Sequence, residues 1–116
     1  MDLVRDFRRG AVAVHVLHHA AEDYVHGAWL SEELARHGHR ISPGTLYPLL
    51  HRMVDAGLLT DHEEVVNGRV LRCYRATRAG RRALTELRRS IGELVEEVAV
   101  VPRAAARRSV RSSGST

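Results

Sequence analysis

Residues Ser42–Leu59 decide the fold of this chain, with the sequence Ser-Pro-Gly-Thr-Leu-Tyr-Pro-Leu-Leu-His-Arg-Met-Val-Asp-Ala-Gly-Leu-Leu. Ser42 and Pro43 are typical of a helix start, because serine caps the helix and proline in the first turn loses no hydrogen bond. Apolar residues then follow in steps of three and four, which predicts a helix that ends at Gly57. Its inward face is expected to comprise Leu46, Leu49, Leu50, Met53 and Val54.

The outward face of this helix carries hydroxyl, imidazole and guanidinium groups, which bind the phosphate oxygens and base edges of DNA. Ser42 and Thr45, beside the helix N-terminus, suit phosphate oxygens. His51 or Arg52 is expected to read a base edge, and Tyr47 to pack on a sugar or a thymine methyl group. The predicted DNA contacts of this segment are Ser42, Gly44, Thr45, Tyr47, Pro48, His51 and Arg52.

Two helices are predicted before this segment. The first spans residues 3–21 and is apolar on two faces, so we expect it to be buried from two sides, one of them by a second subunit. The second starts around Ser31, whose hydroxyl suits a cap, and ends at Gly38. Ser31 is added to the predicted DNA contacts. The apolar positions of the first helix are Leu3, Phe7, Ala11, Val14, Leu17 and Ala21 on one face and Val12, Val16 and Ala20 on the other; those of the second are Trp29, Leu30 and Leu34.

A β-hairpin follows, with strands over residues 58–66 and 69–76. The turn Asn67-Gly68 between them is the strongest short hairpin signal. A two-residue turn pairs Glu63 with Arg72, a favourable cross-strand charge pair. We expect the tip to lie along the DNA backbone or in a minor groove, through Asn67, Gly68, Arg69 and Arg72. The face expected to pack on the helices comprises Val65, Val70, Tyr74 and Ala76.

A long last helix is predicted over residues 78–101, with Thr77 as its cap and Pro102 at its end. Its apolar residues recur in alternating steps of three and four, the seam that a partner helix covers. We therefore expect a homodimer formed through this helix, with the first helix contributing. The predicted dimer interface comprises Leu3, Phe7, Val14, Leu84, Leu87, Ile91, Leu94, Val98 and Val101.

The predicted fold is mainly α with a β-hairpin wing: a winged helix-turn-helix that forms a homodimer through its C-terminal helix. Three segments are expected: a winged-helix DNA-binding domain over residues 1–76, a dimerisation helix over 77–102 and a disordered basic tail over 103–116. The alternative from another class is a dimeric interaction module that does not bind DNA. That reading leaves the helix after Ser42 and the arginine-rich wing without a role.

Composition narrows the possible functions. The 116 residues include 18 basic side chains, all arginine, against 14 acidic ones, a balance that suits a polyanionic partner. The single cysteine, Cys73, excludes an internal disulfide framework. No phosphate-binding glycine loop, nucleophile elbow or deaminase zinc motif points to an enzyme. No signal peptide or membrane span is indicated, so the expected location is the cytoplasm.

The residues from Ser42 to Leu59 resemble the recognition-helix signature of the PadR family of bacterial transcriptional regulators. The stretch Gly68–Gly80 resembles the family's wing strand and the entry to its last helix, and Val25–Trp29 its element before the second helix. Ala76 and the Ala28-Trp29 pair depart from the usual pattern. The resemblance implies a homodimeric repressor on a pseudo-palindromic operator, released by an effector that binds near the dimer interface. It does not identify the operator, the regulated gene or the effector.

The first helix also carries histidines and carboxylates at helical spacing. Histidines four residues apart can chelate Zn²⁺ or a similar ion, with a carboxylate as a third ligand. The alternative is that His15 and His18 are core or interface residues hydrogen-bonded to carbonyl groups and that His19 is solvated. No cofactor is required by the predicted function, and a divalent transition metal is the possible effector. The candidate metal ligands are His15, His18, His19, Glu22 and His26. His37 and His39, in the turn after the second helix, are expected to lie near phosphates, and Cys73 to be a packed thiol.

Overall fold

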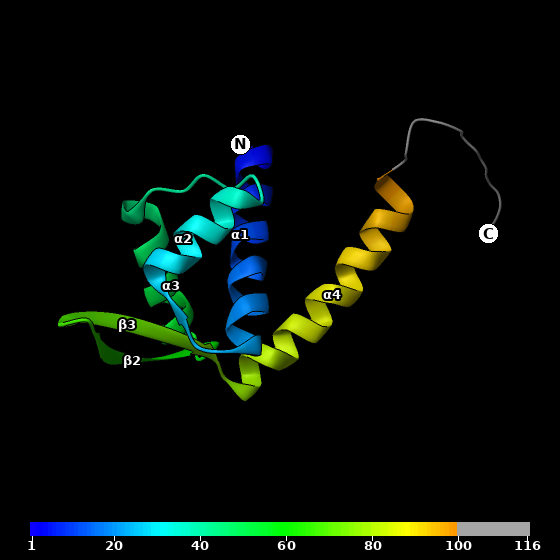
Figure 1. Cartoon of the computed structure of the whole chain (residues 1–116). Helices are drawn as coiled ribbons and strands as arrows, with labels where there is room; N and C mark the ends of the chain where they lie inside the picture. The colour runs from blue at the N-terminus through cyan, green and yellow to red at the C-terminus, as the bar shows by residue number, and fades with distance from the viewer. Residues whose placement is uncertain (100–116) are drawn as a thin grey trace. The chain divides into compact units, whose positions relative to one another are not determined.

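A computed structural model describes residues 1–99 of the chain (Figure 1). It divides into two compact units, Met1–Glu86 and the part that begins at Leu87. The first unit holds three helices, a small sheet and the first turns of a last helix, which continues into the second unit. The elements are α1 (Leu3–Glu22), β1 (Val25–His26), α2 (Gly27–Arg36), α3 (Pro43–Asp55), β2 (Leu59–Val66), β3 (Arg69–Ala76) and α4 (Arg78–Val98).

The core of the first unit is aliphatic and lies where α1, α2 and α3 meet the sheet. The second apolar face predicted for the first helix is buried, and Leu17 of the first face is buried with it, whereas Leu3 and Phe7 are exposed. The face predicted for α3 is also confirmed, with Leu46, Leu50 and Met53 inside. The buried side chains of the three helices are Val12, Val16, Leu17, Ala20, Leu30, Leu34, Leu46, Leu50 and Met53.

The hairpin has the predicted register. Asn67 and Gly68 have φ values of 52° and 75°, as a two-residue turn between twisted strands requires. Val66 faces Arg69 and Glu63 faces Arg72 across the strands. The predicted packing face is wrong in its outer half, because Val65 and Val70 are 71% and 63% exposed while Tyr74 and Ala76 are buried. β2 and β3 extend beyond the helices, so the helices cover only the base of the hairpin and its tip projects as a wing (Figure 1).

A third strand was not predicted. β1 is only two residues long and pairs antiparallel with β3, which gives the strand order β1-β3-β2. It occupies residues expected to lie between helices, and α2 begins directly after it at Gly27 rather than around Ser31. Ser31 therefore lies inside α2, half-buried, and caps no helix.

The two predicted helix caps differ. Thr77 caps α4 as expected, because its hydroxyl oxygen accepts a hydrogen bond of 3.0 Å from the backbone N–H of Gly80. Ser42 occupies the cap position of α3, but its hydroxyl bonds that of Thr45 at 3.2 Å instead of a backbone N–H. The side chain of Ser42 therefore forms no hydrogen bond with the N–H groups in the first turn of α3.

The last helix is α4, which ends at Val98. Val101, the predicted helix end at Pro102 and the predicted tail over 103–116 lie outside the described residues. The inner end of α4 belongs to the first unit, where Leu84 is 3% exposed. Within residues 1–99, no helix combines the length and apolar character that crossing a bilayer requires.

Candidate nucleic-acid interface

The polar face of α3 is open to solvent. All seven positions predicted to contact DNA on this segment, from Ser42 to Arg52, are exposed, while the opposite face of the helix is buried. A major groove about 12 Å wide admits one α-helix, so a helix that presents such a face can enter it. Tyr47 also rests on the start of α2, because a Cβ at Gly27 would lie 2.6 Å from its ring. The absence of a side chain at Gly27 leaves the room that the tyrosine ring occupies.

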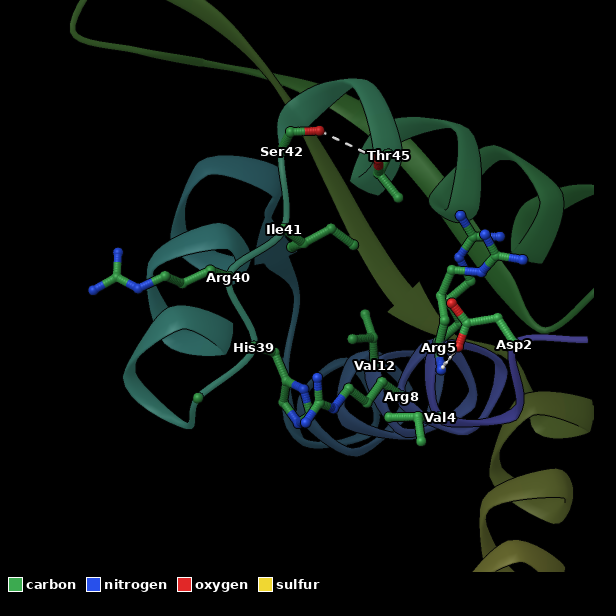
Figure 2. A pocket seen from close by; sticks show the side chains of 12 residues that line it. Asp2, Val4, Arg5, Arg8, Val12, His39, Arg40, Ile41, Ser42 and Thr45 are labelled. Carbon is green, nitrogen blue, oxygen red and sulfur yellow. Dashed lines mark hydrogen bonds between the residues drawn. The ribbon is translucent and has the colours of Figure 1, made fainter.

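Arginines that were not predicted as contacts surround the N-terminus of α3. A pocket of about 680 Å³ lies between α1 and the turn before α3, lined by residues of both (Figure 2). Arg8 and Arg9 line it and have no carboxylate partner in the described chain, whereas Arg5 lies 3.9 Å from Asp6. Arg40, also in the lining, extends away from the pocket in Figure 2. Their place in the fold, rather than any motif, brings these cations beside Ser42 and Thr45.

The two arginines of the wing differ in their surroundings. Arg72 donates to Asp61 at 2.9 Å and to Glu63 at 3.1 Å, so its charge is already matched by two carboxylates of β2. Arg69 lies at the turn, exposed, with no ion pair in residues 1–99. Both arginines were predicted to contact DNA. In the structure the side chain of Arg69 is exposed at the turn, whereas that of Arg72 is bound by carboxylates of its own sheet. Asn67 and Gly68, the other predicted contacts here, form the exposed tip.

The histidines of α1 join two that were assigned elsewhere. The ring of His15 lies 4.9 Å from that of His39 and 5.5 Å from that of His37. Glu33 accepts from the Nε2 of His37 at 3.1 Å, and its carboxylate lies 3.7 Å from the Nε2 of His19. The turn that connects α2 to α3 therefore folds onto α1 through imidazole rings. We refer to His15, His19, Glu33, His37 and His39 as the histidine cluster.

Packing in the histidine cluster disfavours positive charge on α1. Burial lowers the pKa of His15, and the neighbouring His39 and His37 lower it further. Burial also lowers the pKa of His19, with a further contribution from His18, while Glu33 acts in the opposite direction. Neutral imidazoles are the form that binds metal ions.

The predicted metal ligands are split between two places. The ligand atoms of His18, His19 and Glu22 lie within 4.8 Å of one another on α1, as expected. His15 is part of the histidine cluster and not of this group. His26 was placed with them wrongly, because α1 ends at Glu22 and His26 lies on β1. There it belongs to a second group, with Glu64 and Cys73.

The predicted dimer residues that the structure describes are buried, half-buried or exposed. Leu84 is a core residue of its own unit, so the open seam of α4 begins at Leu87, which is half-buried. Val95, which was not predicted, is exposed beside the seam. Val14 is half-buried. The predicted residues that are exposed are Leu3, Phe7, Ile91, Leu94 and Val98.

Comparison with known proteins gives a consistent result. Residues 16–86 match the model of the "Transcriptional regulator PadR-like family". The chain is 61% identical over 95 residues to the transcriptional regulator Rv3488 of Mycobacterium tuberculosis, covering 82% of this chain and 89% of that protein. A crystal structure of a PadR family transcriptional regulator from Eggerthella lenta superposes with a TM-score of 0.73 at 33% identity, over 84% of this chain and 86% of the other. A PadR-like regulator from Bacillus cereus gives 0.72 at 29% identity, over 78% and 90%.

Proposed function

The chain belongs to the PadR-like family of transcriptional regulators, and from this premise we propose that it binds duplex DNA as a homodimer and represses transcription until an effector releases it. It regulates transcription and is not an enzyme. Its place of action in this proposal is the cytoplasm, where bacterial DNA lies.

The observation that carries the proposal is the division of α3 into a buried apolar face and an exposed polar face. The exposed face supplies hydroxyls, an imidazole and the guanidinium of Arg52, the groups that bind phosphates and base edges. Arg8 and Arg9 add positive charge beside its N-terminus, and Arg69 adds it at the wing tip. These cations support contacts to the phosphate backbone on both sides of the helix that enters the groove.

Dimerisation follows from the exposed apolar residues of α4 in this proposal. Ile91, Leu94 and Val98 are between 43% and 63% exposed and share one helix face, which a second copy would cover. Two copies present two α3 helices, and helix-turn-helix dimers read half-sites about 34 Å apart. An operator with two-fold symmetry is the matching DNA.

A second candidate function is a metal-responsive regulator of the same fold. The group His18, His19 and Glu22 favours it, because these residues lie within coordination reach on one turn of α1. A metal there regulates DNA binding only if it binds one dimer geometry more tightly than the other.

Footprinting on the DNA upstream of the protein's own gene and its neighbours tests the main proposal, followed by gel shifts at several salt concentrations. We expect a protected two-fold symmetric site, with an affinity that falls steeply as salt increases. A dimer that shifts neither this DNA nor random duplexes at low salt would instead be the interaction module that does not bind DNA.

A further inference from the structure

We propose that His26, Glu64 and Cys73 form a binding site for a Zn²⁺-like transition metal ion at the base of the wing. The three residues come from three different strands, β1, β2 and β3. The site is separate from the α1 group of the second candidate function. It also does not depend on DNA binding.

The sheet brings the three side chains together through its register. His26 pairs with Cys73 across β1 and β3, and Cys73 pairs with His62 across β3 and β2. Glu64 lies two residues after His62 on β2, and side chains two apart share a face of a strand. The Nε2 atom of His26 lies 3.1 Å from a Glu64 carboxylate oxygen. All three ligand atoms are within 4.8 Å of one another.

These distances suit a tetrahedral ion. Zinc bonds of about 2.0 Å to nitrogen and oxygen and about 2.3 Å to sulfur place neighbouring ligand atoms about 3.4 Å apart. The three atoms therefore need only a small closing movement. A fourth position is left for water or for His62, whose Nε2 lies 3.7 Å from the other oxygen of Glu64.

The donor set and its burial indicate a borderline-soft transition metal rather than Ca²⁺ or Mg²⁺, which prefer oxygen ligands alone. Cys73 is fully buried, while His26 and Glu64 are 35% and 47% exposed in their side chains. An ion can thus reach the thiol from solvent past the other two ligands. Burial and the nearby Glu64 carboxylate raise the pKa of the Cys73 thiol. An ion that binds there replaces the thiol proton, which passes to solvent, and supplies the positive charge that stabilises the thiolate.

An occupied site would add a link between β1 and the rest of the sheet, to which β1 is paired over only two residues. β1 has two residues and leads directly into α2, while β2 and β3 carry the wing. A metal held by one ligand from each strand would fix the base of the wing relative to α2.

Titration of the metal-free full-length protein with Co²⁺ tests the proposal, because cobalt bound by a thiolate gives a charge-transfer band in the near ultraviolet. We expect this band to saturate at one equivalent and to be lost in Cys73→Ala. Glu64→Gln, which keeps the shape of a half-exposed side chain, should weaken cobalt binding by more than tenfold. His18→Ala is the matched control in the α1 group and should leave the band unchanged.

Absence of the band in the wild-type protein, or its persistence in Cys73→Ala, would overturn the proposal. Circular dichroism establishes that each variant is folded. If Cys73→Ala does not fold, Glu64→Gln decides: an affinity for cobalt equal to that of the wild type rejects the site.

Discussion

The helices α3 and α4 are both amphipathic, yet the described chain buries the apolar face of α3 and leaves most of that of α4 exposed. α3 buries its apolar face within its own unit and leaves a polar face exposed. α4 buries Leu84 at its inner end, and from Ile91 onward its apolar residues are exposed. An exposed polar face needs no protein partner, whereas contiguous exposed apolar residues indicate an interaction site. The difference separates a helix whose apolar face is buried within one copy from a helix whose apolar face, in the proposed function, a second copy covers.

Charging the open seam of α4 should have the largest effect. Leu87→Arg together with Leu94→Arg places four arginines in the dimer interface, and we expect monomers that no longer bind the operator. The loss follows because one subunit reads only one of two half-sites. Analytical ultracentrifugation gives the size of the particle and gel shifts give the DNA affinity.

The matched control adds the same charge to the same helix away from the seam. Thr85 and Gly92 are exposed and lie on another face of α4, so Thr85→Arg with Gly92→Arg should remain dimeric. A dimer of wild-type size for the leucine variant would show that the seam is assigned wrongly.

Two glycines of α4 should respond oppositely to alanine, which sharpens the contrast between its ends. A Cβ at Gly80 would collide with the carbonyl oxygen of Leu58, whereas one at Gly92 meets nothing within 4 Å. We expect Gly80→Ala to destabilise the protein by about 1–3 kcal/mol, as overpacking does. Gly92→Ala should stabilise it by up to about 1 kcal/mol through helix propensity. Urea denaturation measures both; equal effects would mean that Gly80 does not pack closely against the backbone of Leu58.

On the DNA-facing side, the two kinds of contact should be separable. Arg52→Ala removes a base contact in the proposed complex and should reduce discrimination between operator and random DNA by about 1–3 kcal/mol. Arg69→Ala removes a phosphate contact, so binding to all sequences should weaken and the salt slope should flatten by about one. Gel shifts on both DNAs across a salt series distinguish the two. Identical behaviour of the two variants would reject the winged-helix docking geometry.

Arg72 is the internal control for the wing. Its guanidinium is bound by Asp61 and Glu63, so Arg72→Ala should change the salt slope much less than Arg69→Ala does. A slope change as large as that of Arg69→Ala would show that Arg72 leaves its carboxylates when DNA binds.

Local sequence signals predicted most of the fold. Ser42-Pro43, Gly57 and Asn67-Gly68 set the bounds of α3 and the hairpin register because their backbone preferences act within a few residues. β1 was missed because two residues carry no periodicity, and only pairing with β3 makes them a strand. Because β1 was missed, His26 was grouped with the histidines of α1 instead of with Glu64 and Cys73.

The candidate site was predictable where one element supplies it and not where several do. The exposed face of α3 follows from its periodicity alone. The cations around its N-terminus were not predicted, because only the packing of α1 brings Arg8 and Arg9 into the lining of the same pocket as Thr45. The register predicted that Glu63 faces Arg72. It was not inferred that this pairing would hold Arg72 on the sheet and away from DNA. The second carboxylate that binds Arg72 belongs to Asp61, its diagonal neighbour on the same face of the sheet.

Acidification should have the smallest effect and should act on the first unit alone. The pKa values of His15 and His19 are lowered in the folded protein, chiefly by burial. The unfolded chain therefore binds more protons below about pH 6.5, and the free energy of unfolding falls as the pH decreases through that value. Above it both states are neutral at these positions and the stability is fully present.

Urea denaturation between about pH 8 and about pH 5, with a chelator present to remove metal ions, measures this dependence in the range where histidine titrates. His15→Gln should make the decline shallower, because one of the two depressed groups is gone. Described α4 contains no histidine, so the dimer measured by ultracentrifugation should persist over the pH range in which the first unit loses stability. If acid instead dissociates the dimer before it weakens the fold, the histidine cluster and the seam of α4 are coupled.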